Sequence, residues 1–455
     1  MKEGCCGGVS GEIFYQRLFL LLLFEKMTRI LKVSIILFFS VVVAFNFTLK
    51  GEYFTRLAES FWSGKTYFLT QPDGSWLDTT PDRGNYYSPH GPFPAVFLLP
   101  FVLVSHLLGV RIYHGYIQPL LVILVFYLCY KVARKVKYEH EDSLFLAFAF
   151  CFSTVFLGSA LWPGFIAHTL VTLLIFLLIY NGIQENPTLQ GGDELNADMS
   201  SSLGIPRLSR WGGRHNSLNK VPEVLLGLFV GLLLLTRASS VGILVFPLMS
   251  ILTNKGEGWI EKTKKVFLLC TPVILAFILF FAYNWIRFQN VFEFGYTNAI
   301  NLAGSTKARD YGVLSLYHIP GNLYYFLLAT PLPVFKDEIS HVLTFPFVKA
   351  DPWGMSIFVT SPIFGYLFLL SYKDKLSKIL MLTISVIAFS IFLYYAIGSR
   401  QFGYRYALDF LPLLFFLLIK NYKNTFGKLS DGFKLLIFVS SLTNLYFFIT
   451  AYFMN

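Results

Sequence analysis

Two carboxylates lie close together in the string WLDTTPDRGNYYSPHGPFP, residues 76–94. Asp78 and Asp82 precede a long apolar segment, so they stand just outside a membrane if that segment enters one. A carboxylate in such a position can act as a general base on an incoming hydroxyl or amine. The same residues also suit a solvated turn, because Asp, Pro and Gly favour turns. These residues alone leave both interpretations open.

Three ionisable residues interrupt or end apolar segments, where a charge facing lipid costs at least about 2.5 kcal/mol. His168 follows Trp-Pro-Gly at the start of one segment, Arg237 interrupts another, and Arg287 ends a third. His168 and Arg237 are therefore candidates for substrate binding. The alternatives are a histidine that bonds to the backbone at a helix end and, for Arg287, a side chain that extends to the membrane interface.

Arg400 and Arg405 stand at the mouth of a later apolar segment, in the string GSRQFGYRYALDFLP, residues 398–412. Arginine binds phosphate esters well, because its planar guanidinium donates two parallel hydrogen bonds. Both residues are therefore candidate phosphate contacts. Asp409 follows Arg405 by four residues, so a structural ion pair on one helix is the alternative.

Cofactor and metal motifs are missing from the sequence. It contains no nucleotide-binding loop, dinucleotide fingerprint, zinc motif or serine nucleophile elbow. Its five cysteines have no metal-ligand spacing, so we expect neither a metal nor a cofactor. The net charge of +11 comes mostly from Lys and Arg between apolar segments, which indicates membrane anchoring rather than nucleic-acid binding.

The elements that must position these residues are predicted to be membrane-spanning helices. The 455 residues are 55% hydrophobic and only 14% charged, whereas soluble domains are about a quarter charged. Since a helix needs about 20 apolar residues to cross the hydrocarbon layer, the sequence predicts an all-α polytopic membrane protein with about 10–13 transmembrane helices. The apolar segments are 30–48, 92–109, 113–131, 143–161, 164–182, 223–252 with a break at 236–240, 265–287, 354–371, 377–397, 403–420 and 433–452.

The orientation of the chain follows from Lys and Arg, which are enriched at the cytoplasmic ends of transmembrane helices. Their clusters place the N-terminus and the later basic loops inside, so segments 49–91, 288–353 and 398–403 fall outside. The basic run at 131–137 conflicts with simple counting, which places it outside as well. The conflict disappears only if one segment within 92–131 does not cross fully.

These segments divide the chain into four parts. Residues 1–29 are predicted to be a cytoplasmic or interfacial segment, and 30–183 an N-terminal membrane core. Residues 184–222 are rich in Gly, Ser, Asn and charge, which predicts a flexible cytoplasmic insertion. Residues 223–455 form a C-terminal membrane region. In the first external loop, 52–62 have apolar residues at helical spacing and predict an amphipathic helix on the membrane surface.

The order of these features resembles the GT-C glycosyltransferases, polytopic enzymes that take a sugar from a polyprenyl-phosphate carrier. Within that class the chain is most similar to bacterial relatives of protein O-mannosyltransferases and of the lipid A aminoarabinose transferase. The resemblance rests on the surface helix followed by Trp76–Pro100, and on Leu233–Ser240, Tyr283–Tyr296 and Phe402–Pro412, in this order.

The resemblance implies a GT-C-like core in a bacterial cytoplasmic membrane, with the active site on the outer face. It implies a polyprenyl-phosphate-linked sugar as donor, a lipid, glycan or protein as acceptor, and membrane lipids as the surroundings. Asp78 would deprotonate the acceptor, with Asp82 as the second choice. His90, near the position of a lysine in relatives, would contact the phosphate together with Arg405, and Arg400 and Arg237 would follow.

Glu52 is a third candidate base. Many relatives have Asp-Glu directly after the first span, whereas this chain has Gly51-Glu52. Two other functions stay open. A transporter or flippase would show paired charges near the midplane and repeated halves with broken helices. A surface-polysaccharide polymerase or ligase would carry a large external loop late in the chain, such as 288–353.

Overall fold

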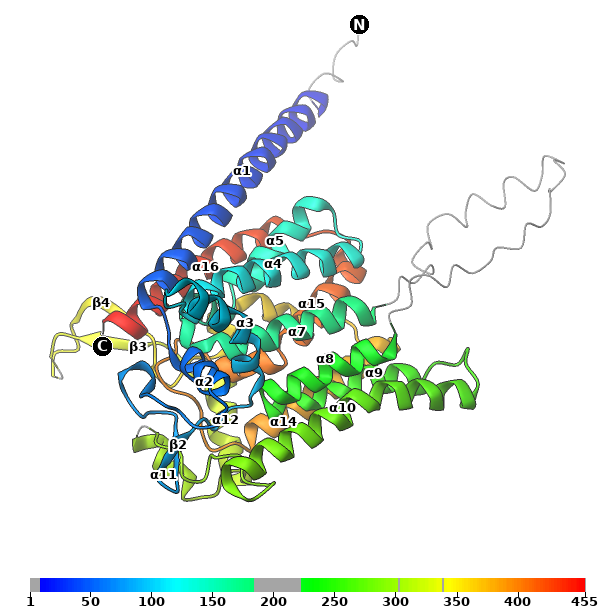
Figure 1. Ribbon diagram of the computed structural model, residues 1–455. Coiled ribbons are helices and arrows are strands. Elements are labelled where there is room, and N and C mark those ends of the chain that lie inside the picture. The colour runs from blue at the N-terminus through cyan, green and yellow to red at the C-terminus, as the bar shows by residue number, and fades with distance from the viewer. Residues whose placement is uncertain (1–8, 184–221, 302, 338, 455) are drawn as a thin grey trace, which may run out of the picture.

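The computed structural model describes residues 9–183, 222–301, 303–337 and 339–454 (Figure 1). Within these residues the chain is an all-α polytopic membrane protein with two small β-hairpins, which confirms the predicted fold class. Six helical stretches of the described chain are long and apolar enough to cross a membrane by length and composition: Thr28–Leu49, His114–Lys135, Pro163–Gly182, Trp259–Phe288, Lys375–Phe392 and Asp431–Phe453.

The elements follow one another in this order: α1 (Val9–Leu49), α2 (Tyr53–Trp62), η1 (Pro72–Gly74), β1 (Thr80–Asp82), β2 (Asn85–Tyr87), α3 (Phe93–Leu108), η2 (His114–Tyr116), α4 (Gln118–Lys135), α5 (His140–Phe152), α6 (Phe156–Leu161), η3 (Pro163–Phe165), α7 (Ile166–Gly182), α8 (Glu223–Thr236), η8 (Ala238–Leu244), α9 (Val245–Leu252), α10 (Trp259–Phe288), α11 (Ala303–Arg309), η9 (Leu316–His318), α12 (Ile319–Leu327), β3 (Leu332–Phe335), β4 (Leu343–Lys349), α13 (Ile357–Thr360), η10 (Pro362–Leu369), α14 (Lys375–Phe392), η11 (Arg405–Asp409), α15 (Leu411–Phe426) and α16 (Asp431–Phe453).

The helix bundle has two chemically different ends. At the basic end, the last turn of α4 meets the end of α7, where Lys135 Nζ donates to the Tyr180 carbonyl at 2.7 Å. The loops between α4 and α5 and between α15 and α16 lie at this end too, and Lys434 pairs with Asp142 across them at 3.0 Å. We call the other end, where the segments after α1, after α10 and after α14 gather, the loop end.

The helices alternate between these two ends. From the basic end to the loop end run α1, α5 with α6, α8, α10, α14 and α16. Back to the basic end run α4, α7, η8 with α9, α13 with η10, and η11 with α15. Several of these passages are broken or short, as predicted for the break at 236–240, where α8 ends and η8 begins. In the described chain, six of these passages contain a stretch that is long and apolar enough to cross a membrane.

The segment predicted to span at 92–109 does not run from one end of the bundle to the other. Its helix, α3, has 16 residues, so it is only about 24 Å long. It runs beside the amphipathic helix α2, with Trp62 stacked on His106 at 6.1 Å between ring centroids. Directly after α3, Arg111 returns to Glu52 at the start of α2. Both helices therefore lie at the loop end, and α4 carries its basic run to the basic end without any conflict in counting.

Two apolar clusters hold the bundle together. The large one is rich in aromatic rings from α5, α6, α7 and α15, among them Phe150, Phe176 and Phe415 in edge contact. The smaller cluster lies at the loop end and joins α2 and α3 to the first turns of α4 and α7 through residues such as Leu57 and Leu98. It fixes the first predicted external loop to the bundle. The helix predicted at 52–62 is confirmed as α2, whereas its predicted position on the membrane surface stays a prediction.

The predicted insertion at 184–222 lies outside the described residues except for its last residue. Residues 9–29 of the predicted N-terminal segment belong to α1, one continuous helix of 41 residues. A helix of this length measures about 60 Å, roughly twice the thickness of the hydrocarbon layer.

Candidate functional site

Asp78 is held through its backbone at the loop end. Its N–H donates to the carbonyl of Ile300 at 2.8 Å, and its own carbonyl accepts from the Tyr53 hydroxyl at 2.6 Å. Its φ of +58° lies in the left-handed region, which Asp tolerates better than most residues. The carboxylate is exposed and makes no hydrogen bond or ion pair with any other described residue. It is therefore available to a ligand.

The surroundings of Asp78 act on its charge. Burial by neighbouring protein raises the pKa of Asp78 above its ordinary value, and the positive charge of Arg405 opposes this. The carboxylate is thus reached by water and at the same time flanked by protein. A raised pKa makes a carboxylate a better base, because the ideal catalytic pKa lies near the working pH.

Asp82 is engaged in a turn. β1 and β2 pair as an antiparallel hairpin, with Arg83 and Gly84 at its tip, both in the left-handed region. This is the backbone of a tight two-residue turn, so the turn interpretation is confirmed here. The Asp82 carboxylate accepts from Arg83 Nε at 2.8 Å and both side chains are partly exposed.

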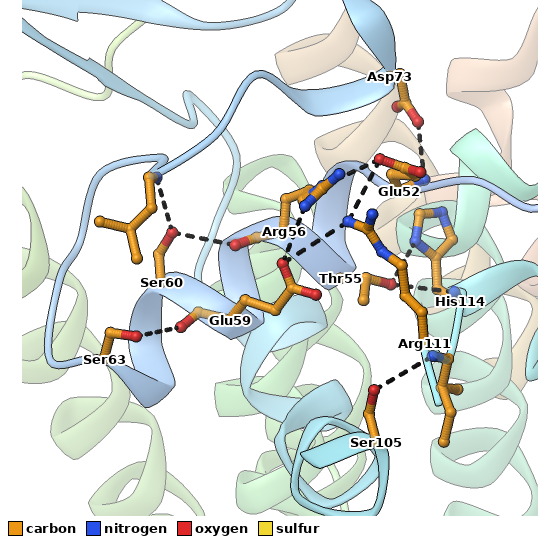
Figure 2. Close-up of polar contacts among 12 residues, drawn as sticks. Glu52, Thr55, Arg56, Glu59, Ser60, Ser63, Asp73, Ser105, Arg111 and His114 are labelled. Atoms are coloured by element: carbon orange, nitrogen blue, oxygen red, sulfur yellow. Dashed lines mark hydrogen bonds and ion pairs between the residues drawn. The ribbon is translucent and has the colours of Figure 1, made fainter. Parts of the chain in front are cut away.

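Glu52 belongs to a network of four charged side chains, shown in Figure 2. Its carboxylate lies 3.0 Å from Arg56 and 3.6 Å from Arg111, and Glu59 meets the same two guanidiniums at 3.5 and 3.9 Å. The Glu52 N–H also donates to Asp73 at 2.8 Å. The charges of the two carboxylates and the two guanidiniums cancel, so Glu52 has no free charge for a ligand. The network also connects α2 to the segment after α3.

His90 lies directly before Gly91, which packs against the end of α8. A Cβ on Gly91 would lie 2.1 Å from the Leu235 carbonyl oxygen, so only glycine permits this approach. The contact places His90 beside Arg237, which follows Leu235 by two residues. Burial, and then the charges of Arg237, Arg405 and Arg287, lower the pKa of His90 to about 3. His90 is therefore a neutral imidazole at physiological pH, able to donate one hydrogen bond but carrying no charge.

Arg237 is paired with a fully buried carboxylate. Its Nε lies 2.8 and 3.0 Å from the two oxygens of Asp409, and Ser239 donates to Asp409 at 2.5 Å. His168 completes the group, 3.5 Å from Arg237 and 3.9 Å from Asp409. The break between α8 and η8 makes this possible, since it turns Arg237 into the bundle. The alternative of an Arg405–Asp409 pair is wrong, because Asp409 pairs with Arg237.

Arg405 has no carboxylate partner in the described part of the chain. Its guanidinium lies 4.4 Å from the ring centre of Phe165, and one Nη donates to the Ser399 carbonyl at 2.8 Å. Its Nε is buried and has no hydrogen-bond partner among the described residues. A small cavity of about 10 Å³, room for about one water molecule, lies against it. Arg400, in contrast, is exposed and lies in a turn at φ +49°.

Arg287 does not extend to the interface, so that alternative is wrong. It is only 1% exposed, it donates to the carbonyl of Ser88, and it donates to Asn284 at 2.6 Å. Its guanidinium lies 3.9 Å from the ring centre of Tyr283. Arg287 thereby fixes the backbone just before His90, and its charge contributes to the low pKa of that histidine.

The structure thus brings some of the predicted residues together and sets others apart. One group at the loop end combines Asp78, His90, His168, Arg237 and Arg405. Asp82 and Glu52 are engaged in ion pairs of their own, and Arg400 is exposed. Within the described residues, no cluster of His, Cys, Asp or Glu could hold a metal ion.

Sequence reasoning missed Tyr53 and the partner role of Asp409, and it assigned Arg287 to the membrane interface instead of to this group. Asp409 carried one usable signal, because a carboxylate and an arginine in apolar segments balance each other if they pair. Tyr53 carried none, since nothing in a tyrosine at the start of a surface helix indicates that its hydroxyl holds a carbonyl 25 residues away.

No protein-family model and no curated protein matches this chain. Among solved structures, the chain is similar to the oligosaccharyltransferase of Archaeoglobus fulgidus in its apo form, with 12% sequence identity and a TM-score of 0.42. The alignment covers 91% of this chain and 55% of the archaeal protein, so this chain spans about half the length of that structure.

Proposed function

We propose that this chain is a glycosyltransferase that moves a sugar from a polyprenyl-phosphate carrier to an acceptor on the extracytoplasmic face of the membrane. One observation carries the proposal: at the loop end, the Asp78 carboxylate, which no other described residue engages, lies close enough to Arg405 for its pKa to respond to that charge. Arg405 itself has no counter-ion among the described residues. A base beside an anion site is the pair that transfer from a phosphate ester requires.

The loop end is the extracytoplasmic end in this proposal. Lys and Arg of the α4–α5 and α15–α16 connections lie at the opposite end, which the positive-inside rule assigns to the cytoplasm. A donor carried by a membrane lipid would reach the site from the bilayer. A bacterial cytoplasmic membrane fits this arrangement, and the acceptor, whether lipid, glycan or protein, would approach from the water.

The basic residues have different roles in the proposal. Arg405 would hold the carrier phosphate, because its buried Nε has no partner in the described residues. Arg237 is a weaker candidate, since Asp409 already balances its charge. His90 is neutral and would donate one hydrogen bond to a phosphate oxygen. Arg400, which is exposed to solvent, would help to attract the anionic donor.

The reaction is a single displacement. The Asp78 carboxylate takes a proton from the acceptor hydroxyl or amine while the acceptor atom forms a bond to the anomeric carbon. The bond from this carbon to the phosphate oxygen breaks, and its electron pair leaves with polyprenyl phosphate. Arg405 stabilises the negative charge that develops on the leaving phosphate. Such a displacement inverts the anomeric configuration.

A transporter of lipid-linked sugars is the second candidate, and a specific observation favours it. The bundle contains a broken helix pair, α8 and η8, with a buried Arg237–Asp409 ion pair at the break. Charged residues at broken helices occur in transporters. The pair nevertheless lies at the loop end beside His90 rather than in mid-bundle, which suits surface chemistry better.

Purified protein in sealed proteoliposomes separates the two functions. The vesicles contain radiolabelled polyprenyl-phosphate hexoses, and a membrane extract supplies the acceptor. The proposal predicts that polyprenyl phosphate is released and that the label appears in a new product, in a membrane without an ion gradient. Movement of intact donor between the leaflets, without cleavage of the sugar–phosphate bond, would contradict it and identify a transporter.

A further inference from the structure

The hairpin of β3 and β4 exposes an unusual amount of apolar surface. Phe345 is 69% exposed and Phe347 is 54% exposed, and Phe335, Val342 and Leu343 are exposed as well. A two-stranded hairpin is marginal in water, and its open edges invite pairing with other chains. Some apolar environment must therefore cover this hairpin.

The hairpin is attached to the loop end of α16. The Tyr446 hydroxyl donates to the carbonyls of Pro346 and Val348, the latter at 2.7 Å, and the Ala350 N–H donates to Thr450 at 3.1 Å. Figure 1 shows both strands beside the C-terminal end of this helix. These bonds occupy one side of β4 and leave its aromatic side chains pointing away from the bundle.

The surface of α16 beside the hairpin is apolar and exposed, as expected for a helix that faces lipid. Its Leu442 is 64% exposed and Val439 is exposed too, on a helix that is long and apolar enough to cross the membrane. The apolar surface of the hairpin therefore continues a surface that lipid already covers. Open sheet edges do not occur within the hydrocarbon layer, which excludes a deep position. Aromatic side chains are enriched at the membrane–water interface instead.

We propose that the β3–β4 hairpin lies in the interfacial layer of the membrane at the loop end, with Phe345 and Phe347 in contact with acyl chains. Lys336 lies at the turn of the hairpin, and Lys349 ends β4 at the opposite end, paired with Leu332. Basic residues at this depth are attracted to anionic lipid headgroups. The hairpin would then fix the height of the loop end, and with it the candidate site, relative to the lipid surface.

Site-directed fluorescence tests this position in the full-length chain, reconstituted in vesicles of phosphatidylethanolamine and phosphatidylglycerol. An environment-sensitive fluorophore is attached to F345C or, independently, F347C, in a chain whose native cysteines are replaced. N298C, in an exposed loop of the same end, is the water control, and L442C is the lipid control. Lipids with a nitroxide near the headgroup or deep in the acyl chain, and iodide in the water, are the quenchers.

The proposal predicts that labels at 345 and 347 lose iodide quenching relative to 298, and that the shallow nitroxide quenches them more than the deep one. Iodide quenching equal to that at 298, without lipid quenching, would place the hairpin in water and overturn the proposal. Protection from both quenchers would also overturn it, since a protein partner or a second copy would then be the cover. Two independent positions keep the test valid if one variant does not fold.

Discussion

At the scale of single residues, three guanidiniums at the loop end have different charge balances. Arg237 has a buried counter-ion, whereas Arg405 and Arg287 have no carboxylate partner in the described residues. A cation held by aromatic rings and carbonyls keeps its charge for a ligand. The uncompensated charge of Arg405, rather than the number of basic residues, is what makes the group suitable for a phosphate.

The Arg237–Asp409 pair should contribute to stability rather than to charge recognition. Removing one partner of a buried pair costs about 3–5 kcal/mol, because the other charge stays buried alone. We therefore expect D409N and R237Q each to lower the unfolding temperature in detergent strongly. The double variant R237M/D409L should recover much of that loss, and a double-mutant cycle measures the coupling. Additive losses in the double variant would show that the two side chains do not act as a pair.

His90 should make stability depend on pH. Its pKa is about 3 in the folded protein and near its ordinary value of 6.5 when unfolded. Between these two values the unfolded chain binds the extra proton, so stability falls as pH decreases from about 6.5 towards 3. H90Q should reduce this acid-side loss in thermal unfolding series. An unchanged pH dependence in H90Q would contradict the neutral state of His90.

At the scale of elements, the contact between Gly91 and the end of α8 connects the first loop to the bundle. A Cβ at this position would displace the backbone that carries His90. Since a misplacement of about 1 Å can cost on the order of 10²-fold in rate, we expect G91A to lose most transfer activity. G432A is the matched control, because nothing lies within 4 Å of a Cβ there. Equal activity of both variants would show that this approach does not position the site.

Hydropathy was sufficient to predict most elements, but it did not predict the direction in which α3 runs. The long apolar runs predicted the passages and the break before Arg237, because the lipid environment imposes apolar composition on any spanning helix. The same composition predicted α3 as a full passage, whereas its buried side chains, such as Leu98, face α2 and the first turns of α4 and α7 at the loop end, and Leu107 and Leu108 are exposed. Composition shows that a helix lies in apolar surroundings, but it does not show whether these are lipid or protein.

Within the site, the sequence predicted the ionisable residues but not their pairing. Asp409 lies 172 residues from Arg237, and the four-residue spacing to Arg405 suggested the wrong partner. Likewise, residue type alone did not separate Asp78 from Asp82, and only the resemblance ranked Asp78 first. The structure separates them, because the hairpin engages Asp82 with Arg83. Such distinctions depend on contacts between distant segments, which a single sequence does not contain.

At the scale of the whole molecule, the course of α3 determines on which side each later loop lies. Val110, exposed just after α3, should be on the same side of the membrane as the first loop. We expect V110C in a cysteine-free chain to react with a membrane-impermeant maleimide added outside intact cells or spheroplasts. K137C, after α4, should react only after permeabilisation. The reverse pattern would mean that α3 crosses the membrane.

The proposed function depends most directly on Asp78. Transfer of labelled sugar from polyprenyl phosphate is measured in proteoliposomes for wild type, D78N and D82N, each at equal folded protein. The amide keeps the shape of the carboxylate but cannot take a proton, so D78N should lose transfer by about 10²-fold or more while it still binds polyprenyl phosphate. D82N should stay within a few-fold of wild type, because its carboxylate only pairs with Arg83. Undiminished transfer by D78N would contradict the assignment of the base and the proposed mechanism with it.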